Sequence, residues 1–259
     1  MAFFECNFFA ESLGMCSSMY VVLPQPTRGQ IGLKGVGSAD GCPVLYLLHG
    51  MSDDHSIWLR RTSIERYAAQ YGIAVVMPNV HRSYYNNMVC GLRYWDFISS
   101  ELPEIVGSFF KFSRKREDTF AAGLSMGGFG ALKLGLNCPE KFAAVAGMSS
   151  AIRPAHLASV MKERLPEFEN IFGDLSRIPG SSNDLYFKAE EALANGTRLP
   201  EIFLACGTED FLYQENLLYK AHLEKLGIPF VYREGPGTHE WGFWDRYIQE
   251  ILAWLPIRK

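Results

Sequence analysis

Ser125 has the surroundings in this sequence that most strongly suggest chemistry. It stands in GLSMG, residues 123–127, which fits the pattern G-x-S-x-G, and the apolar stretch DTFAAG precedes it. Where a strand ends at the first glycine and a helix begins at the serine, the sharp turn exposes the hydroxyl and leaves no room for flanking side chains. The helix N-terminus also brings backbone N–H groups to the place where an oxyanion would form. The segment therefore predicts a serine nucleophile.

Other functions of a glycine-rich turn must be weighed against this one. A serine that caps an ordinary helix fits the same five residues, and this alternative stays open at the level of the motif. The stretch GLSMGGFG lacks the G-x-G-x-x-G spacing of a dinucleotide site, and the sequence has no GK[ST] of a phosphate-binding loop. Nucleotide binding at this turn is therefore not expected.

A serine nucleophile needs a base, which in this arrangement follows an acid later in the chain. Only His156, His222 and His239 come after Ser125. His239 lies in GPGTHEW, just past the last predicted strand, and ligands bind at the carboxyl ends of parallel strands. His222 lies in the charged stretch YKAHLEKLG, where a solvent-facing role is simpler, and nothing in its position favours His156. We therefore expect His239 to be the base.

The acid should follow the strand that precedes the histidine. CGTED, residues 206–210, offers Glu209 and Asp210 at that place. A carboxylate there would accept the Nδ1–H of His239 and stabilise the imidazolium. Both residues could equally cap the next helix, so the residues alone leave the choice between them open.

The stretch LLHGM, residues 47–51, is the second place where a backbone donor is expected. In this kind of site one oxyanion donor follows the nucleophile and the other follows a His-Gly pair after an early strand, which indicates the N–H groups of Met126 and Met51. Asp53 and Asp54 lie close by, but two adjacent carboxylates without partners at ligand spacing do not predict a metal site. No metal and no organic cofactor is expected.

Short apolar runs that alternate with segments of helical period surround these motifs. Such alternation predicts an α/β fold with a mostly parallel central sheet and helices on both faces. Strands are predicted at 18–24, 43–49, 72–78, 118–123, 142–150, 200–207 and 229–235. Helices are predicted at 56–70, 93–111, 125–137, 211–226 and 240–255. Residues 26–42 are predicted to be a loop, and 152–199 a functional insertion above the sheet with helical pieces broken at Pro166 and Pro179. Residues 1–259 are expected to form a single domain.

Composition limits the remaining possibilities. Apolar residues make up 48% of the 259 residues, charged residues 20%, and the formal net charge is −3, which favours a globular protein without a nucleic-acid footprint. No run is apolar enough for a membrane span, and the N-terminus lacks the features of an export signal. The six cysteines form no CxxC pair, which argues against zinc and disulfides and favours a cytoplasmic location.

Taken together, four segments in one order resemble the α/β-hydrolase fold: LLHGM, GLSMGG, CGTED and GTHEWGFW. Further stretches, including PVLYLLHGMS, SIWLRRT and AGLSMGGFGALKL, are similar to the esterase D family, over residues 5 to 257. That family includes small bacterial tributyrin and acetyl esterases, S-formylglutathione hydrolases, feruloyl esterases and mycolyltransferases.

The resemblance implies a serine carboxylesterase acting on short-chain acyl esters of small molecules, with Ser125 as nucleophile, Asp210 as acid and His239 as base. It also implies an acyl pocket formed by the His-Gly loop and the elbow, for which we name His49, Gly50, Trp58 and Trp241. Thiol-ester hydrolysis, feruloyl or acetyl-carbohydrate ester hydrolysis and acyl transfer at the same site are the alternatives, and a noncatalytic binding protein is the alternative of another class. A dimer or tetramer is expected from the family.

Overall fold

The sheet carries the architecture of the molecule. A computed structural model describes residues 1–32 and 41–257, and within them eight strands form one sheet in the order β1-β2-β4-β3-β5-β6-β7-β8. The strands are β1 (Ala2–Ala10), β2 (Met15–Leu23), β3 (Val44–Leu48), β4 (Ala74–Pro78), β5 (Thr119–Leu124), β6 (Ala144–Met148), β7 (Glu201–Gly207) and β8 (Val231–Gly235). β2 is antiparallel to both β1 and β4, and all the other neighbours are parallel. This confirms the predicted mostly parallel sheet.

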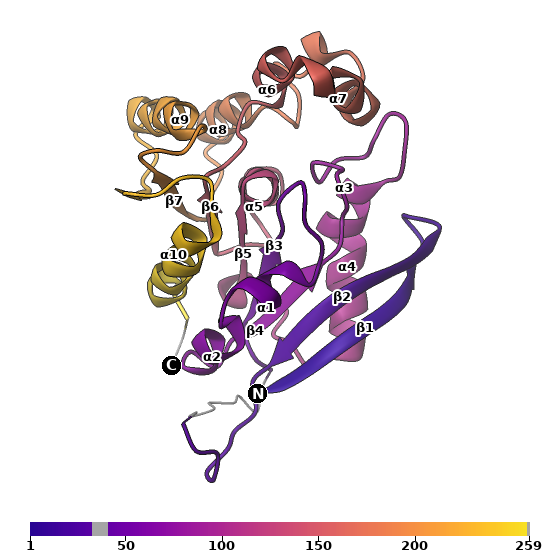
Figure 1. The fold of residues 1–259 in the computed structure, drawn as a ribbon, viewed down its shortest axis with the longest axis vertical. Coiled ribbons are helices and arrows are strands. Elements are labelled where there is room, and N and C mark those ends of the chain that lie inside the picture. Colours follow the sequence, from indigo (N-terminus) through magenta and orange to yellow (C-terminus); the bar gives the residue numbers. More distant parts are fainter. Residues whose placement is uncertain (33–40, 258–259) are drawn as a thin grey trace.

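Helices cover both faces of the sheet and form two apolar cores (Figure 1). The helices are α1 (Ile57–Arg61), α2 (Ile64–Ala69), α3 (Tyr94–Asp96), α4 (Leu102–Phe109), α5 (Met126–Asn137), α6 (Pro154–Val160), α7 (Leu165–Phe172), α8 (Leu185–Ala194), α9 (Tyr213–Leu226) and α10 (Trp241–Trp254). α1, α2 and α10 contribute to one core, and α4 to α9 contribute to the other. The central strands β3 to β6 are buried almost throughout because both of their faces are covered.

The first strand, β1, was not predicted from the sequence. Residues 2–10 form β1, which pairs with all nine residues of β2 at the edge of the sheet. Phe3, Phe4 and Phe9 are exposed on β1, so the segment lacks the regular alternation that reveals a strand with one buried face.

The predicted helix over 56–70 was wrong in one respect, because it is two helices. Thr62 has an extended backbone, its hydroxyl donates to the Trp58 carbonyl at 2.6 Å, and the same oxygen accepts from the Ile64 N–H at 3.1 Å. A local side-chain hydrogen bond thus replaces the helical one and divides α1 from α2. The predicted helix over 93–111 also has an irregular part, a π-helical turn at Phe97–Glu101 between α3 and α4.

The segment over 152–199 contains α6, α7 and α8 joined by short 3₁₀ turns, and it connects β6 to β7 (Figure 1). Pro166 does not interrupt a helix as expected; it lies in the first turn of α7, where its missing N–H has no partner to lose. Part of the loop predicted over 26–42, residues 33–40, lies outside the described residues.

Candidate active site

The turn between β5 and α5 has the strained backbone of a nucleophile elbow. Ser125 has φ 54° and ψ −118°, a conformation that L-residues rarely adopt. A Cβ on Gly127 would lie 2.4 Å from the Leu48 carbonyl oxygen, and a Cβ on Gly123 would lie 2.3 Å from the Gly127 oxygen. Only glycine fits at either position, which explains the G-x-S-x-G pattern.

Ser125 does not act as an ordinary helix cap. Its side chain makes no capping hydrogen bond to α5, although it precedes the first helical residue. Its backbone is held instead by neighbouring segments: the N–H donates to the Met148 carbonyl at 2.8 Å, and the carbonyl accepts from Ala151 at 3.1 Å. The capping alternative from the sequence is therefore wrong, and the hydroxyl remains available for chemistry.

His239 lies in the loop between β8 and α10, and both sides of this loop are fixed. Glu240 caps α10 by accepting from the N–H groups of Gly242 at 2.6 Å and Phe243 at 2.8 Å. Before the histidine, Gly237 has φ 151° and lies close to Gly207, so that a Cβ on Gly207 would be only 2.1 Å from the Gly237 oxygen. These constraints hold the imidazole in place before any substrate arrives.

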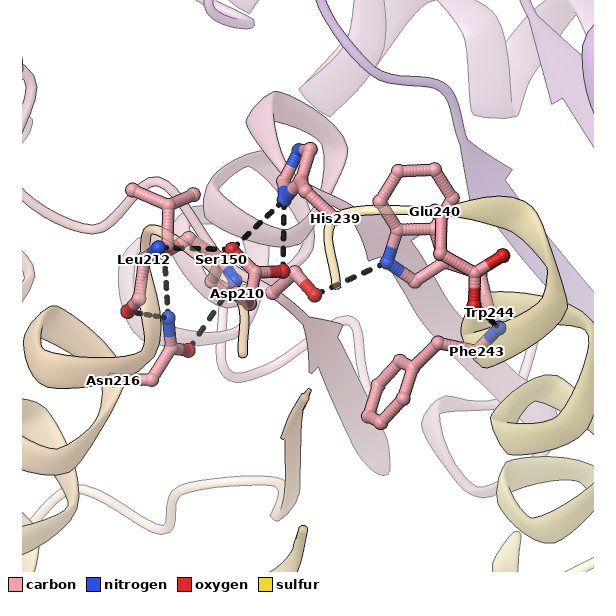
Figure 2. Close-up of polar contacts among 9 residues, drawn as sticks. Ser150, Asp210, Leu212, Asn216, His239, Glu240, Phe243 and Trp244 are labelled. Carbon is pink, nitrogen blue, oxygen red and sulfur yellow. Dashed lines mark hydrogen bonds and ion pairs between the residues drawn. The ribbon is translucent and has the colours of Figure 1, made fainter. Parts of the chain in front are cut away.

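The imidazole of His239 points at the carboxylate of Asp210 (Figure 2). The Nδ1 atom lies 2.9 Å from Oδ2 and 3.1 Å from Oδ1 of Asp210. Because an ionised carboxylate can only accept, Nδ1 carries the hydrogen, and Nε2 is free to take a proton. The pair has the arrangement of the base and acid in a catalytic triad.

The Asp210 carboxylate is completely buried yet remains ionised. Burial opposes its charge, but the hydrogen bond and the charge of His239, the Leu212 N–H at 2.8 Å and the Ser149 hydroxyl together hold its pKa below the ordinary value. Glu209, the other acid of CGTED, accepts instead from the Gly237 N–H at 2.7 Å and is exposed. Of the two acids that the residues left open, Asp210 is the one that the structure places against His239.

Two further residues support the acid and were missed at the sequence level. The hydroxyl of Ser149, which contacts Asp210, accepts from the indole N–H of Trp244 at 3.1 Å. The side chain of Asn216 bonds both the N–H and the carbonyl of Ser150, at 3.2 and 3.1 Å, and so ties the end of β6 to α9 (Figure 2). The position of Ser149 and Ser150 at the end of a predicted strand beside the elbow was the available signal.

Ser125 and His239 line the same cavity, of about 470 Å³. This volume is within the range of small-molecule sites. The wall has both apolar and polar surface and comes from the His-Gly loop, the elbow, the segment over 152–199 and the loop around His239. Its residues are Gly50, Met51, Ser52, Asp53, Tyr84, Leu124, Ser125, Ala151, Leu157, Met161, Arg164, Phe211, Leu212, His239, Trp241 and Trp244.

The four residues named for the pocket divide into two pairs. Gly50 and Trp241 line the cavity, whereas His49 and Trp58 are buried behind its wall. Trp58 packs edge-to-face on Trp241 with ring centroids 5.1 Å apart, and its indole N–H donates to the Leu48 carbonyl at 3.0 Å. It supports the wall without forming it.

His49 is a structural residue of the loop. Its Nε2 accepts from the Val80 N–H at 3.1 Å, so Nδ1 carries the hydrogen that reaches the Gly50 carbonyl at 2.7 Å. Burial lowers the pKa of His49 to about 4, which keeps it neutral. The hydroxyl of Tyr85 donates to the carbonyl of His49 at 2.9 Å. These bonds fix the backbone that precedes Met51.

The N–H groups proposed for the oxyanion belong to Met126, which follows Ser125 in the chain, and to Met51, which lines the same cavity as Ser125. Met126 is the first residue of α5, so its N–H has no partner within the helix. Met51 follows Gly50 in a turn closed by the Asp53 N–H on the Gly50 carbonyl at 3.2 Å, a bond that does not use the Met51 N–H. Both stay candidates for the donors.

The remaining candidates lie elsewhere. His222 on α9 bonds the Tyr186 carbonyl at 3.3 Å, and Asp54 accepts from both the N–H and the hydroxyl of Ser56, at 2.8 and 2.6 Å. Among residues 1–32 and 41–257 no group of three or more His, Cys, Asp or Glu side chains could hold a metal ion. Within the same residues no helix is long and apolar enough to cross a membrane.

Comparison with known proteins adds the family to this geometry. The chain is 32% identical over 262 residues to an acetyl esterase of Caldicellulosiruptor saccharolyticus, with 98% of each chain covered. It is 34% identical to FphF, a fluorophosphonate-binding serine hydrolase of Staphylococcus aureus, and 35% identical to an S-formylglutathione hydrolase (FrmB) of the same organism. Each of these two structures superimposes with a TM-score of 0.86 and 98% coverage of both chains. Residues 19–255 match the family described as "Putative esterase", so the chain belongs to this esterase family and is a carboxylic ester hydrolase of the α/β-hydrolase fold.

Proposed function

We propose that this protein hydrolyses short-chain acyl esters of small molecules, with Ser125 as nucleophile, His239 as base and Asp210 as acid. The observation that carries the assignment is the bond of 2.9 Å between His239 Nδ1 and Asp210, on a histidine that shares a cavity with a serine of strained backbone. The similarity to an acetyl esterase supports the short acyl group.

The mechanism follows from these positions. Ser125 Oγ attacks the ester carbonyl while its proton passes to His239 Nε2, and the N–H groups of Met51 and Met126 stabilise the oxyanion. When the tetrahedral intermediate collapses, His239 returns the proton to the leaving alcohol and the acyl group stays on Ser125. A water molecule then gives its proton to His239 and attacks the acyl-enzyme, which releases the acid and restores the serine.

Asp210 contributes in both halves of this reaction without changing its own protonation. Its buried carboxylate keeps the Nδ1–H tautomer of His239 and stabilises the imidazolium. The Ser149 hydroxyl and the Leu212 N–H help it to stay ionised. No step requires a metal or an organic cofactor.

Thiol-ester hydrolysis is the second candidate, because one of the relatives at 35% identity is an S-formylglutathione hydrolase. The triad serves both reactions, and only the leaving group differs. A cytoplasmic location, which the pattern of cysteines favours, and a dimeric or tetrameric state, which the family resemblance implies, belong to the same proposal.

A labelling experiment tests the nucleophile. We expect a fluorophosphonate probe to label the protein stoichiometrically and Ser125→Ala to lose the label. Ser52→Ala, which changes the other serine of the cavity wall, should still be labelled. Absence of labelling in folded wild-type protein would refute the assignment.

A substrate panel tests the reaction. Rates with p-nitrophenyl esters of two to twelve carbons should be highest for the short chains, and methyl ferulate and S-formylglutathione measure the two neighbouring activities. A clear preference for S-formylglutathione would replace the first candidate by the second.

A further inference from the structure

Arg164 brings a positive charge into the wall of the catalytic cavity. It ends the 3₁₀ turn Lys162–Arg164 between α6 and α7, and it lines the cavity together with Leu157 and Met161. Its guanidinium Nη1 lies 3.0 Å from the sulfur of Met51. The side chain therefore reaches from the segment over 152–199 to the loop that holds the proposed oxyanion donor.

The charge of Arg164 is not matched by an acid. In the part of the chain that the structure describes, Arg164 forms no ion pair, and its contact is to a sulfur, which is a weak acceptor. Arg82 provides the contrast: its Nη2 also approaches the Met51 sulfur, at 3.3 Å, but its guanidinium binds both carboxylate oxygens of Glu167. Of the two arginines at this methionine, Arg82 is paired with a carboxylate, whereas Arg164 has no such partner among the described residues.

The cavity wall also contains one acid, which does not form an ion pair with Arg164 among the described residues. Asp53 is the one carboxylate among the lining residues. Burial and the charge of Asp54 raise its pKa, and the charges that favour its ionised form come from Arg61 and His239. Arg164 is not among the charges that act on Asp53, so this carboxylate does not pair with the Arg164 guanidinium.

We propose that Arg164 binds a carboxylate carried by the substrate, so that the preferred esters are anionic. This inference rests on the proposed ester hydrolysis and names the substrate class of that site. A guanidinium offers five N–H donors in a planar fork that matches a carboxylate. Arg164 is the one arginine or lysine among the residues that line the cavity, and no carboxylate of the described residues pairs with it, so it favours a substrate that carries a negative charge at one end.

The carboxylate can belong to the acyl group or to the leaving group, and two pairs of substrates distinguish these cases. For the acyl group, the mono-p-nitrophenyl ester of glutaric acid is compared with its methyl ester, which lacks the charge. For the leaving group, 4-acetoxybenzoate is compared with 4-acetoxybenzamide. Within each pair, the kcat/KM of the anionic ester is divided by that of the neutral ester, so that general effects on catalysis, which act on both members alike, cancel.

We expect Arg164→Gln to lower this ratio about tenfold in one of the two pairs, as befits a charge-assisted bond in a partly exposed site. The wild-type ratio should also fall as salt is raised from about 0.01 M to 1 M, because screening weakens charge interactions at the surface. Lys162→Gln is the matched control, since it removes the same charge from the same 3₁₀ turn but from a residue that does not line the cavity. Its ratio should equal that of the wild type.

Three results would overturn the inference. The first is an unchanged ratio in both pairs, even where Arg164→Gln slows every ester by the same factor. The second is an equal loss in Lys162→Gln, which would reveal a general field of the surface. The third, no hydrolysis of any of the four esters by the wild type, would refute the proposed function itself and is thereby distinguished from the other two.

Discussion

Lys133, a buried residue of α5, offers a direct test of the electrostatics of the core. Its ammonium group is buried, donates to the Tyr85 carbonyl at 3.0 Å and to Asn86 Oδ1 at 3.1 Å, and lies 4.4 Å from the centre of the Trp95 ring. None of these partners is charged. Burial therefore dominates, and it lowers the pKa of Lys133 from 10.5 to about 7.

The free energy of unfolding must then depend on pH with a definite sign. Between about pH 7 and pH 10.5 the unfolded chain carries a proton on Lys133 that the folded protein lacks. Unfolding takes up this proton, so the contribution of Lys133 to the free energy of unfolding rises with pH through this window and is constant below it. Each pH unit contributes about 1.4 kcal/mol, which gives roughly 3 kcal/mol between pH 7 and pH 9.

Lys133→Met isolates this effect, because methionine fills similar space and cannot be protonated. Urea unfolding of both proteins from pH 6 to pH 9 should give a difference in stability that moves in favour of the wild type as pH rises. Lys162→Met, at an exposed position, should give a difference that does not change with pH. A difference between wild type and Lys133→Met that stays constant from pH 7 to pH 9 would refute the reasoning.

Three further substitutions test the site and its support. Asp210→Asn should lower kcat for p-nitrophenyl acetate about 10⁴-fold with an unchanged circular dichroism spectrum, since the tautomer of the base is lost; a loss below about tenfold would contradict the assignment of the acid. Gly127→Ala should cost about 3 kcal/mol or more in urea unfolding, because its Cβ would lie 2.4 Å from the Leu48 oxygen, whereas Gly29→Ala, with no atom within 4 Å, should change stability by less than about 0.5 kcal/mol. Trp241→Ala should open the cavity wall and raise the ratio of the rates for octanoate and acetate p-nitrophenyl esters about tenfold, which corresponds to about two further buried CH₂ groups at roughly 0.8 kcal/mol each. An unchanged ratio would place the acyl group elsewhere.

Local patterns predicted most elements well. Seven strands and the helices α5, α9 and α10 begin and end within three residues of the prediction, because buried parallel strands are continuous apolar runs and the helices have clear periodicity. β1 was missed since three of its four phenylalanines, Phe3, Phe4 and Phe9, are exposed at an edge. The break at Thr62 was missed since it depends on one hydroxyl that replaces a helical hydrogen bond.

The sequence by itself determined the order of the chemical groups: a serine between glycines, an acid pair after a strand, a histidine after the last strand, and a His-Gly loop before them all. These features depend on local backbone geometry, which short motifs encode. The residues alone left Glu209 and Asp210 open and the family resemblance implied Asp210, which is the acid that the tertiary structure places against His239. Only the tertiary structure decided that His49 and Trp58 lie behind the cavity wall, and that Arg164 is left without an acid beside it. Each of these outcomes depends on how segments far apart in the chain pack together, and no local pattern carries that information.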